Sequence, residues 1–461
     1  MARQMELGAT LRTGVIAIAL ALTLTGEAGA QSSGNGLSNF FGLFSGQKSD
    51  APAQPQAMPG NAGSVQWSGE DGASGHPLMT AAAIREAATN FDNCVAAMWP
   101  DAARRNISQE NFQRFTAGLA PDLRIMDLLD AQPEFTKSIW DYLDILVNDN
   151  RLAKGKEILA QYKAQFDATE KAYGVDRYTI AAIWGIESNY STQIGDRSVL
   201  QSTATLACIG RRQNYFRDEF LSALEILNRG DLRPEQMHGS WAGAFGATQF
   251  MPTAFKRYAV DADGDGRRDV VDDPADLIAS TANNLKKDGW QAGQSWGYEV
   301  IVPQDFNYML ADRAKPVTLA QWEHLGVKRP NSEPYPHPAD KAYLLAPAGA
   351  AGPGFLMLQN FRVIMKYNPA EAYALAIGHF ADRLKGGQPL VQAWPRQERE
   401  LSRTERLELQ QLLVDRGFYR GTPDGQLGGQ TRDALRGFQA SIGVAADGFA
   451  TADMLERLRV H

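Results

Sequence analysis

The 461-residue sequence lacks the short motifs on which metal, nucleotide and thiol chemistry depend. Its 6 histidines are scattered and its 2 cysteines lie far apart, so zinc hydrolases, iron–sulfur proteins and dithiol oxidoreductases are poor fits. No glycine-rich phosphate-binding loop occurs, which leaves nucleotide chemistry without support. Positive charge is also scarce, since 46 Lys and Arg stand against 53 Asp and Glu for a net charge of −7. That balance predicts no nucleic-acid partner, because such a partner selects for a basic face.

Residues 1–30 have the layout of a secretory signal peptide. Arg3 and Arg12 precede the apolar run GVIAIALALTLTG, and the small residues Ala28-Gly29-Ala30 follow it. An apolar core of roughly 7–15 residues ahead of an A-x-A site predicts cleavage after Ala30. A permanent span needs about 20 apolar residues, so an uncleaved short anchor is the weaker alternative. No cysteine follows the run, so we expect an exported protein that is not a lipoprotein.

Export changes the interpretation of the two cysteines. In an oxidising compartment Cys94 and Cys208 can pair, although both lie in apolar helical patterns where buried free thiols are also common. The sequence leaves a disulfide and two free thiols as open alternatives.

Composition divides the rest of the chain into a tether and two folded parts, and the fold class that it predicts is mainly α. Residues 31–75 are rich in Gly, Ser, Ala, Gln and Pro and predict a disordered linker. Residues 76–390 show long amphipathic helical patterns, with loops and a little strand expected over 300–360. A linker at 391–400 precedes a compact unit at 401–461.

The last 60 or so residues predict three helices joined by tight turns. Ser402 and Glu405 form a capping box at the start of the first helix, and Gly417 is placed to end it. The turns Asp424-Gly425 and Asp447-Gly448 echo each other, which suggests a weak internal duplication.

The segment DRYTIAAIWGIESNYS places a carboxylate on an apolar helix face. Ile180 and Trp184 fall at helical spacing, and Glu187 takes the next position of that stripe. Partial burial beside Trp184 is expected to raise the pKa of Glu187, because burial disfavours a charged carboxylate. A glutamate that stays protonated near neutral pH is the general acid that glycosidic cleavage requires. A helix-end glutamate bonded to nearby backbone is the alternative that periodicity leaves open.

Two further stretches carry candidate functional residues. In HGSWAGAFGATQFMP, small residues allow close backbone approach and Gln249 offers an amide among apolar neighbours, although tight helix packing would explain the same pattern. In VDADGDGRRDVVDDPAD, the spacing matches the first half of a calcium loop, with a solvated acidic loop as the alternative. Its candidate ligands are Asp261, Asp263, Asp265, the Arg267 carbonyl and Asp272.

These motifs together resemble the lytic murein transglycosylases. ESNYS is similar to the family's E-S-x-Y-G signature, and GAFGATQFMP is similar to its G-A-x-G-x-x-Q-x-M-P segment. YGVD, LACIGRR and YALAIGHFADRL resemble the B-type branch (glycoside hydrolase family 103), and the C-terminal unit resembles a peptidoglycan-binding module. One departure is Ser191, where the signature has glycine, which puts the local turn in question.

The resemblance implies a lysozyme-like helical catalytic domain that cleaves the MurNAc–GlcNAc bond without water. Glu187 would be the single catalytic residue, with no catalytic cofactor. The substrate-binding residues that it implies are Ser188, Tyr190, Arg211, Arg212, Ser240, Gln249, Tyr367, Asn368 and Tyr373. For Tyr190, a packed aromatic is an equal alternative to a sugar platform. The branch's longer calcium loop favours Asp276 as the last ligand of a structural Ca²⁺.

Peptidoglycan glycan strands are the implied partner, in the periplasm of a Gram-negative bacterium. Cell-wall synthesis or division proteins are candidate further partners, and a monomer is expected. Two alternatives stay open, a catalytically silent wall-binding scaffold and a hydrolytic muramidase, the latter requiring a second carboxylate that the sequence does not place.

Overall fold

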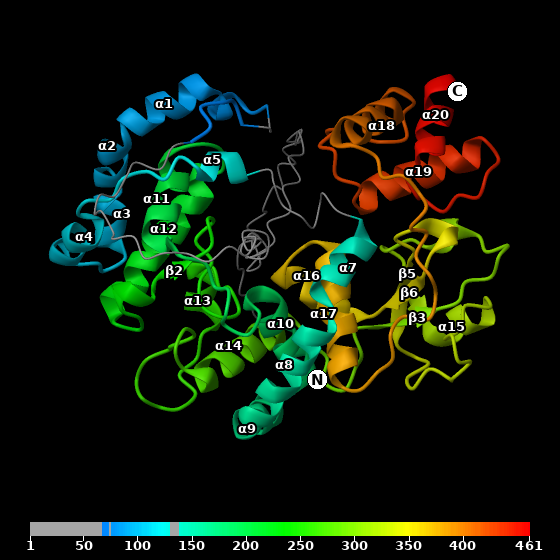
Figure 1. Cartoon of the computed structure of the whole chain (residues 1–461), viewed down its shortest axis with the longest axis horizontal. Coiled ribbons are helices and arrows are strands. Elements are labelled where there is room, and N and C mark those ends of the chain that lie inside the picture. The colour runs from blue at the N-terminus through cyan, green and yellow to red at the C-terminus, as the bar shows by residue number, and fades with distance from the viewer. Residues whose placement is uncertain (1–66, 73–74, 130–137) are drawn as a thin grey trace, which may run out of the picture. The chain divides into compact units, whose positions relative to one another are not determined.

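The computed structural model describes residues 67–72, 75–129 and 138–461 (Figure 1). The predicted signal peptide at 1–30 and most of the predicted linker at 31–75 lie outside the described residues. Within the described ranges, no helix is long and apolar enough to cross a membrane. Helices dominate, which confirms the predicted mainly α class.

Five short helices form the N-terminal part. They are α1 (Ala81–Thr89), α2 (Phe91–Ala96), α3 (Trp99–Arg104), α4 (Gln109–Thr116) and α5 (Ile125–Leu128). Hydroxyl caps start two of them, because Thr80 accepts a hydrogen bond from the Ala83 N–H and Ser108 accepts one from the Asn111 N–H. Cys94 of α2 is bonded to Cys208, so the structure confirms the disulfide over free thiols.

The central helices surround α10, which carries Glu187. Their bounds are α7 (Ile139–Leu146), α8 (Asp149–Gln161), α9 (Lys163–Tyr173), α10 (Arg177–Ser188), α11 (Val199–Cys208), α12 (Gln213–Arg229), α13 (Pro252–Tyr258), α14 (Pro274–Lys287), α16 (Gln359–Tyr367) and α17 (Glu371–Leu384). Helix α10 contacts α8, α9, α14 and α17, and every residue from Thr179 to Ser188 is buried. The apolar stripe predicted for this helix is therefore one side of a helix that is enclosed all round.

Residues 297–357 form a small antiparallel sheet with its own core. The strands are β3 (Gly297–Val300), β4 (Val317–Thr318), β5 (Lys341–Leu345) and β6 (Gly354–Met357), in the order β3-β6-β5-β4. Helix α15 (Leu319–His324) contributes the buried Trp322, whose indole N–H donates to the Ala342 carbonyl at 2.9 Å. This region confirms the loops and strand expected there. Elsewhere, β1 (Arg197–Ser198) pairs with β2 (His238–Gly239).

The remaining short elements are 3₁₀ turns. Their bounds are Pro77–Met79, Pro234–Gln236, Tyr308–Leu310 and Gly349–Ala351.

The C-terminal unit contains three helices, as predicted. They are α18 (Arg403–Asp415), α19 (Gly429–Ser441) and α20 (Ala452–Val460), and the capping box of Ser402 and Glu405 is formed in both directions. The two Asp-Gly turns are held alike. The side-chain oxygen Oε1 of Gln410 accepts from the Gly425 N–H at 2.7 Å, and Oε1 of Gln439 accepts from the Gly448 N–H at 2.7 Å. This shared clamp is the structural counterpart of the suspected duplication.

The folded part begins earlier than composition indicated. Ser68 donates its backbone N–H and its hydroxyl to Asp127 at 3.0 and 2.6 Å, and the Arg85 guanidinium lies 5.2 Å from the Trp67 ring centroid. Residues 67–72 therefore pack on the helical part, although the predicted linker extended to residue 75. Their partners lie up to 59 positions away, where a local composition argument cannot find them.

Candidate active site

Glu187 lies in the last turn of α10 with its side chain almost fully enclosed, at 4% exposure. The Tyr373 hydroxyl, near the start of α17, donates to Glu187 Oε1 at 2.6 Å. Burial, and next the negative charge of Glu187, raise the pKa of Tyr373 well above its usual value. Tyr373 therefore keeps its proton over the whole physiological range and holds the carboxyl in one orientation.

The chain leaves α10 through three consecutive left-handed residues. Asn189, Tyr190 and Ser191 have φ of 48°, 57° and 68°. Ser191 thus adopts the conformation that the family's glycine takes without strain. Its hydroxyl accepts the Trp184 indole N–H at 3.0 Å, and its backbone N–H donates to the Ser188 hydroxyl at 2.9 Å. These two bonds offset the strain, so the departure from glycine leaves the turn intact.

Ser188 ties α10 to the loop that carries Gln249. Its hydroxyl, 1% exposed, donates to the Ala247 carbonyl at 2.6 Å. Gln249, also in the left-handed region, donates its amide to the Gly246 and Ile194 carbonyls at 2.8 and 3.2 Å. Its carbonyl oxygen is buried and has no hydrogen-bond partner among the described residues, which leaves one acceptor available at this loop.

Ser240 and the α16–α17 junction make further hydrogen bonds that hold the Gln249 loop in place. Ser240 accepts from the Ala244 N–H at 3.1 Å, which folds the small-residue segment on itself. Tyr367, at the end of α16, donates its hydroxyl to the Thr248 carbonyl, and Asn368 accepts from the Ala370 N–H at 3.0 Å. The structure therefore gathers the α10 end, the Gln249 loop and the α16–α17 junction around Glu187.

Tyr190 lies inside the helical core, not on an open surface. Its ring is 4% exposed and packs against Trp184, with centroids 6.1 Å apart. A Cβ placed on Gly155 or Gly185 would come within 2.2 or 2.7 Å of this side chain. The absence of a side chain at these two glycines therefore leaves the space that Tyr190 occupies. In this structure the ring offers no face to a sugar, and the packing alternative explains it.

Arg211 and Arg212 lie where α11 ends and α12 begins. Arg211 donates to the Leu129 carbonyl at 3.4 Å, and the Arg212 guanidinium lies 4.5 Å from the Tyr215 ring centroid. Neither contact joins an arginine to Glu187.

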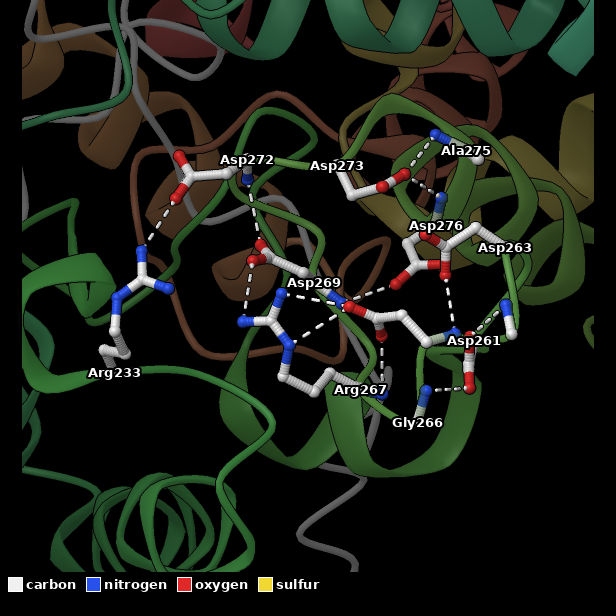
Figure 2. Close-up of polar contacts among 12 residues, drawn as sticks. Arg233, Asp261, Asp263, Gly266, Arg267, Asp269, Asp272, Asp273, Ala275 and Asp276 are labelled. Carbon is white, nitrogen blue, oxygen red and sulfur yellow. Dashed lines mark hydrogen bonds and ion pairs between the residues drawn. The ribbon is translucent and has the colours of Figure 1, made fainter.

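The acidic loop between α13 and α14 and the first turn of α14 together bring three carboxylates close (Figure 2). Asp261, Asp263 and Asp276 each bring one oxygen within 4.8 Å of the others. Backbone N–H groups orient them, including that of Gly266 on Asp261 at 2.9 Å and that of Asp269 on Asp276 at 2.6 Å. Burial raises the pKa of Asp276 to about 6, a cost of ionisation that a bound cation would offset. Oxygen donors of this kind suit Ca²⁺.

Two other predicted ligands face different partners. Asp272 accepts from the Gln236 amide at 2.7 Å. It also pairs with Arg233 at 3.3 Å (Figure 2). Asp265 accepts from the Arg267 backbone N–H at 2.8 Å and pairs with the Arg267 side chain at 3.0 Å, and these two contacts, the backbone one first, lower the pKa of Asp265. The cluster therefore contains Asp276, the ligand that the longer loop favoured, and does not contain Asp272.

Trp241, the residue after Ser240, carries a buried donor that was not among the sequence-predicted site residues. Its side chain is 4% exposed, and its indole N–H has no hydrogen-bond partner among the described residues. Its place between Ser240 and the glycine-rich turn was the available signal, but a lone aromatic in such a segment is indistinguishable from a core residue.

Comparison with known proteins finds two family matches. The family described as "Transglycosylase SLT domain" matches residues 90–382, and "Putative peptidoglycan binding domain" matches residues 402–458. The chain is also similar to membrane-bound lytic murein transglycosylase B of Escherichia coli K12, with 29% identity over 244 residues. That alignment covers 51% of this chain and 64% of the relative, so the chain spans just under two thirds of that curated protein.

Solved structures with the same fold include SltB3 and SltB1 of Pseudomonas aeruginosa. SltB3, in complex with NAG-anhNAM-pentapeptide, is 44% identical with a TM-score of 0.77, covering 80% of this chain and 99% of that one. SltB1 is 26% identical with a TM-score of 0.57, covering 65% and 100%. Slt35 of Escherichia coli, in complex with calcium, is 25% identical with a TM-score of 0.55, covering 64% and 92%.

Proposed function

Since the chain belongs to the transglycosylase SLT domain family, we propose that it is a B-type lytic transglycosylase. It cleaves the MurNAc–GlcNAc β-1,4 bond of peptidoglycan and leaves 1,6-anhydroMurNAc ends, in cell-wall remodelling or turnover. The observation that carries this proposal is the buried Glu187, held by Tyr373, with both residues inside the family's matched region. SltB3 binds a NAG-anhNAM-pentapeptide, a ligand of the product type expected here.

Glu187 acts twice in this mechanism. As a carboxylic acid it protonates the glycosidic oxygen, and the bond from that oxygen to MurNAc C1 breaks. As the resulting carboxylate it takes the proton of the MurNAc C6 hydroxyl, whose oxygen attacks C1. The proton returns to Glu187, so no water is consumed. The substrate's own acetamide stabilises the cationic intermediate, which removes the need for a second carboxylate.

Tyr373 positions the acid, and the surrounding loops bind the sugar. The free Gln249 carbonyl oxygen is suited to accept a hydrogen bond from a hydroxyl or acetamide N–H. Ser240, Tyr367 and Asn368 shape the same wall. Ser188 contributes by fixing the Gln249 loop to α10. Arg211 and Arg212 are assigned to stem or lactyl carboxylates, with charge-assisted bonds.

Calcium has a structural part in this proposal. Asp261, Asp263 and Asp276 would hold the ion, which would neutralise their mutual repulsion and pin the loop between α13 and α14. A calcium complex is known for Slt35.

The proposed place of action is the periplasm, reached through the predicted cleaved signal peptide at residues 1–30. Peptidoglycan strands are the partner, and the C-terminal unit, which matches a putative peptidoglycan-binding domain, is proposed to hold the enzyme on the wall. The chain acts as a monomer.

The test is mass spectrometry of muropeptides released from purified murein sacculi by residues 31–461. Products lighter by one water than hydrolytic products support the proposal, because they report attack by the C6 hydroxyl. Glu187→Gln, which keeps the size of the side chain, should release none while retaining the thermal unfolding of the native protein. Reducing-end products would identify a muramidase instead. Binding to sacculi without any release would identify a scaffold.

A further inference from the structure

A pocket in the N-terminal part is lined by residues of α2, the start of α3, and α4. Figure 1 shows where these three helices lie in the fold. The volume of the pocket is about 540 Å³, within the range of small-ligand pockets, roughly 300–1,000 Å³. It is lined by Phe91, Asp92, Val95, Ala96, Trp99, Gln109, Phe112, Gln113, Thr116, Gly118 and Leu119. None of these residues belongs to the group around Glu187.

Two helical faces border this space without closing it. One face follows Phe91, Val95 and Trp99 at four-residue spacing, and the other runs from Gln109 through Phe112 on α4. Packed helices ordinarily interdigitate and leave few voids larger than a water molecule. A gap of this size between two regular faces therefore has room for a ligand.

The floor of the pocket is aromatic. The Trp99 and Phe112 rings lie 5.4 Å apart between centroids, with their planes inclined by 57°. Phe91 and Phe112 are buried, whereas Trp99 is only partly buried. An indole that is apolar over its face suits the flat, C–H-bearing side of a pyranose ring.

The rim of the pocket is polar, and its polar side chains are available to a ligand. Asp92, Gln109 and Gln113 are exposed, and their side chains make no hydrogen bond or ion pair with any described residue. Two amides and a carboxylate supply donors and acceptors in the planar geometry that sugar hydroxyls and acetamides use. None of the lining residues is basic, which disfavours phosphate, carboxylate and nucleotide ligands.

We propose that this pocket is a secondary glycan-binding site that takes a neutral N-acetylhexosamine unit. The sugar stacks on Trp99, and its hydroxyl and acetamide groups bond to the rim amides and to Asp92. The site goes beyond the proposed cleavage at Glu187 and does not depend on it. It would let the catalytic part bind a glycan strand independently of the C-terminal unit.

The test is calorimetric titration of the full mature chain carrying Glu187→Gln with tetra-N-acetylchitotetraose, and in parallel with glycan strands stripped of peptide. Adding Gln109→Ala and Gln113→Ala should weaken one binding event by roughly tenfold or more, as two lost hydrogen bonds predict. Both residues are exposed, so the fold is retained even if Trp99→Ala fails to fold. Glu110→Ala, on the same helix but outside the lining, is the matched control and should leave the titration unchanged.

The two ligands separate the sources of the sugar. Binding of both ligands, weakened by the rim substitutions, supports a site for a neutral N-acetylhexosamine. Binding of the stripped strands alone would overturn it, because that result requires the lactyl-bearing, negatively charged sugar. Identical titrations with and without the two rim substitutions would overturn the proposal. This outcome is independent of the products formed at Glu187, because Gln109→Ala with Gln113→Ala in the otherwise native chain should still release the same products.

Discussion

The Tyr373 hydroxyl donates a 2.6 Å hydrogen bond to Glu187 Oε1, joining two residues 186 positions apart in the sequence. The bond links the end of α10 to the first turn of α17, and both side chains are buried. A hydrogen bond donated to a carboxyl group inside a protein fixes its orientation and stabilises its charged form. The proposed acid is therefore positioned by a residue outside its own signature motif.

Tyr373→Phe removes this bond and keeps the ring. We expect kcat on sacculi to fall about 10- to 100-fold, since hydrogen bonds to charged groups contribute about 1.5–3 kcal/mol. KM should change little, because the ring remains in place. Steady-state muropeptide release measures both constants. Tyr258→Phe, which loses a bond to Asp288, is the control and should leave kcat unchanged; equal kcat in both variants would contradict the positioning role.

Tyr190→Phe tests whether Tyr190 packs or binds substrate. Its buried hydroxyl has no hydrogen-bond partner among the described residues, so removing it should leave the free energy of unfolding unchanged or raise it by up to about 1 kcal/mol. Urea unfolding measures this change. Tyr258→Phe should instead destabilise the protein, because that hydroxyl is bonded. A fall in kcat/KM for Tyr190→Phe at unchanged stability would show a substrate contact.

Asp276→Asn and Asp272→Asn distinguish the two candidate last ligands. We expect Ca²⁺ to raise the melting temperature of the native protein by several degrees, since a ligand at about 100 times its Kd contributes about 2.7 kcal/mol. Asp276→Asn should abolish the shift, whereas Asp272→Asn should preserve it because Asp272 faces Gln236 and Arg233. Thermal unfolding with Ca²⁺ and with EGTA measures both. The reverse pattern would assign the site to Asp272.

Reduction of the Cys94–Cys208 disulfide should destabilise the fold. The bond spans 114 residues, and closing a loop of that size restricts the unfolded chain by about 4–5 kcal/mol on the entropic account. Equilibrium unfolding in urea with and without reductant measures the difference. The doubly substituted Cys94→Ala, Cys208→Ala chain should match the reduced protein and should not respond to reductant.

His379 should make the protein sensitive to acid. Burial, and next Arg383, lower the pKa of His379 from 6.5 to about 4 in the folded state. The unfolded chain therefore takes up the proton first, so stability is complete above pH 6.5 and is lost as the pH falls toward 4. The loss approaches roughly 3 kcal/mol at pH 4.

His379→Leu removes this titration. Burial also raises the pKa of Asp382 to about 6, so ionisation of this carboxyl lowers the stability of the protein as the pH rises, which is opposite to the effect of His379. The native and variant proteins must therefore be compared at each pH. We expect the difference between their free energies of unfolding to change between pH 7 and pH 4. A constant difference would show that His379 does not titrate as buried.

The sequence by itself determined the features that depend on neighbouring residues. Helical periodicity placed Glu187 on α10 beside Trp184, and the capping box of Ser402 and Glu405 marked the start of α18. These patterns reach only a few positions along the chain, so local stereochemistry encodes them. The family resemblance, resting on separated motifs, was confirmed by the matches to residues 90–382 and 402–458.

Only the tertiary structure decided which distant side chains meet. Tyr373 reaches Glu187, Asp276 joins Asp261 in place of Asp272, and Tyr190 is enclosed by helices. Each outcome depends on how separate helices and loops pack, and packing sums many weak contacts between segments that no sequence window contains. The spacing of carboxylates along the loop could therefore predict a candidate cation site, and the family resemblance could favour Asp276, but only the folded chain shows Asp276 beside Asp261 and Asp263.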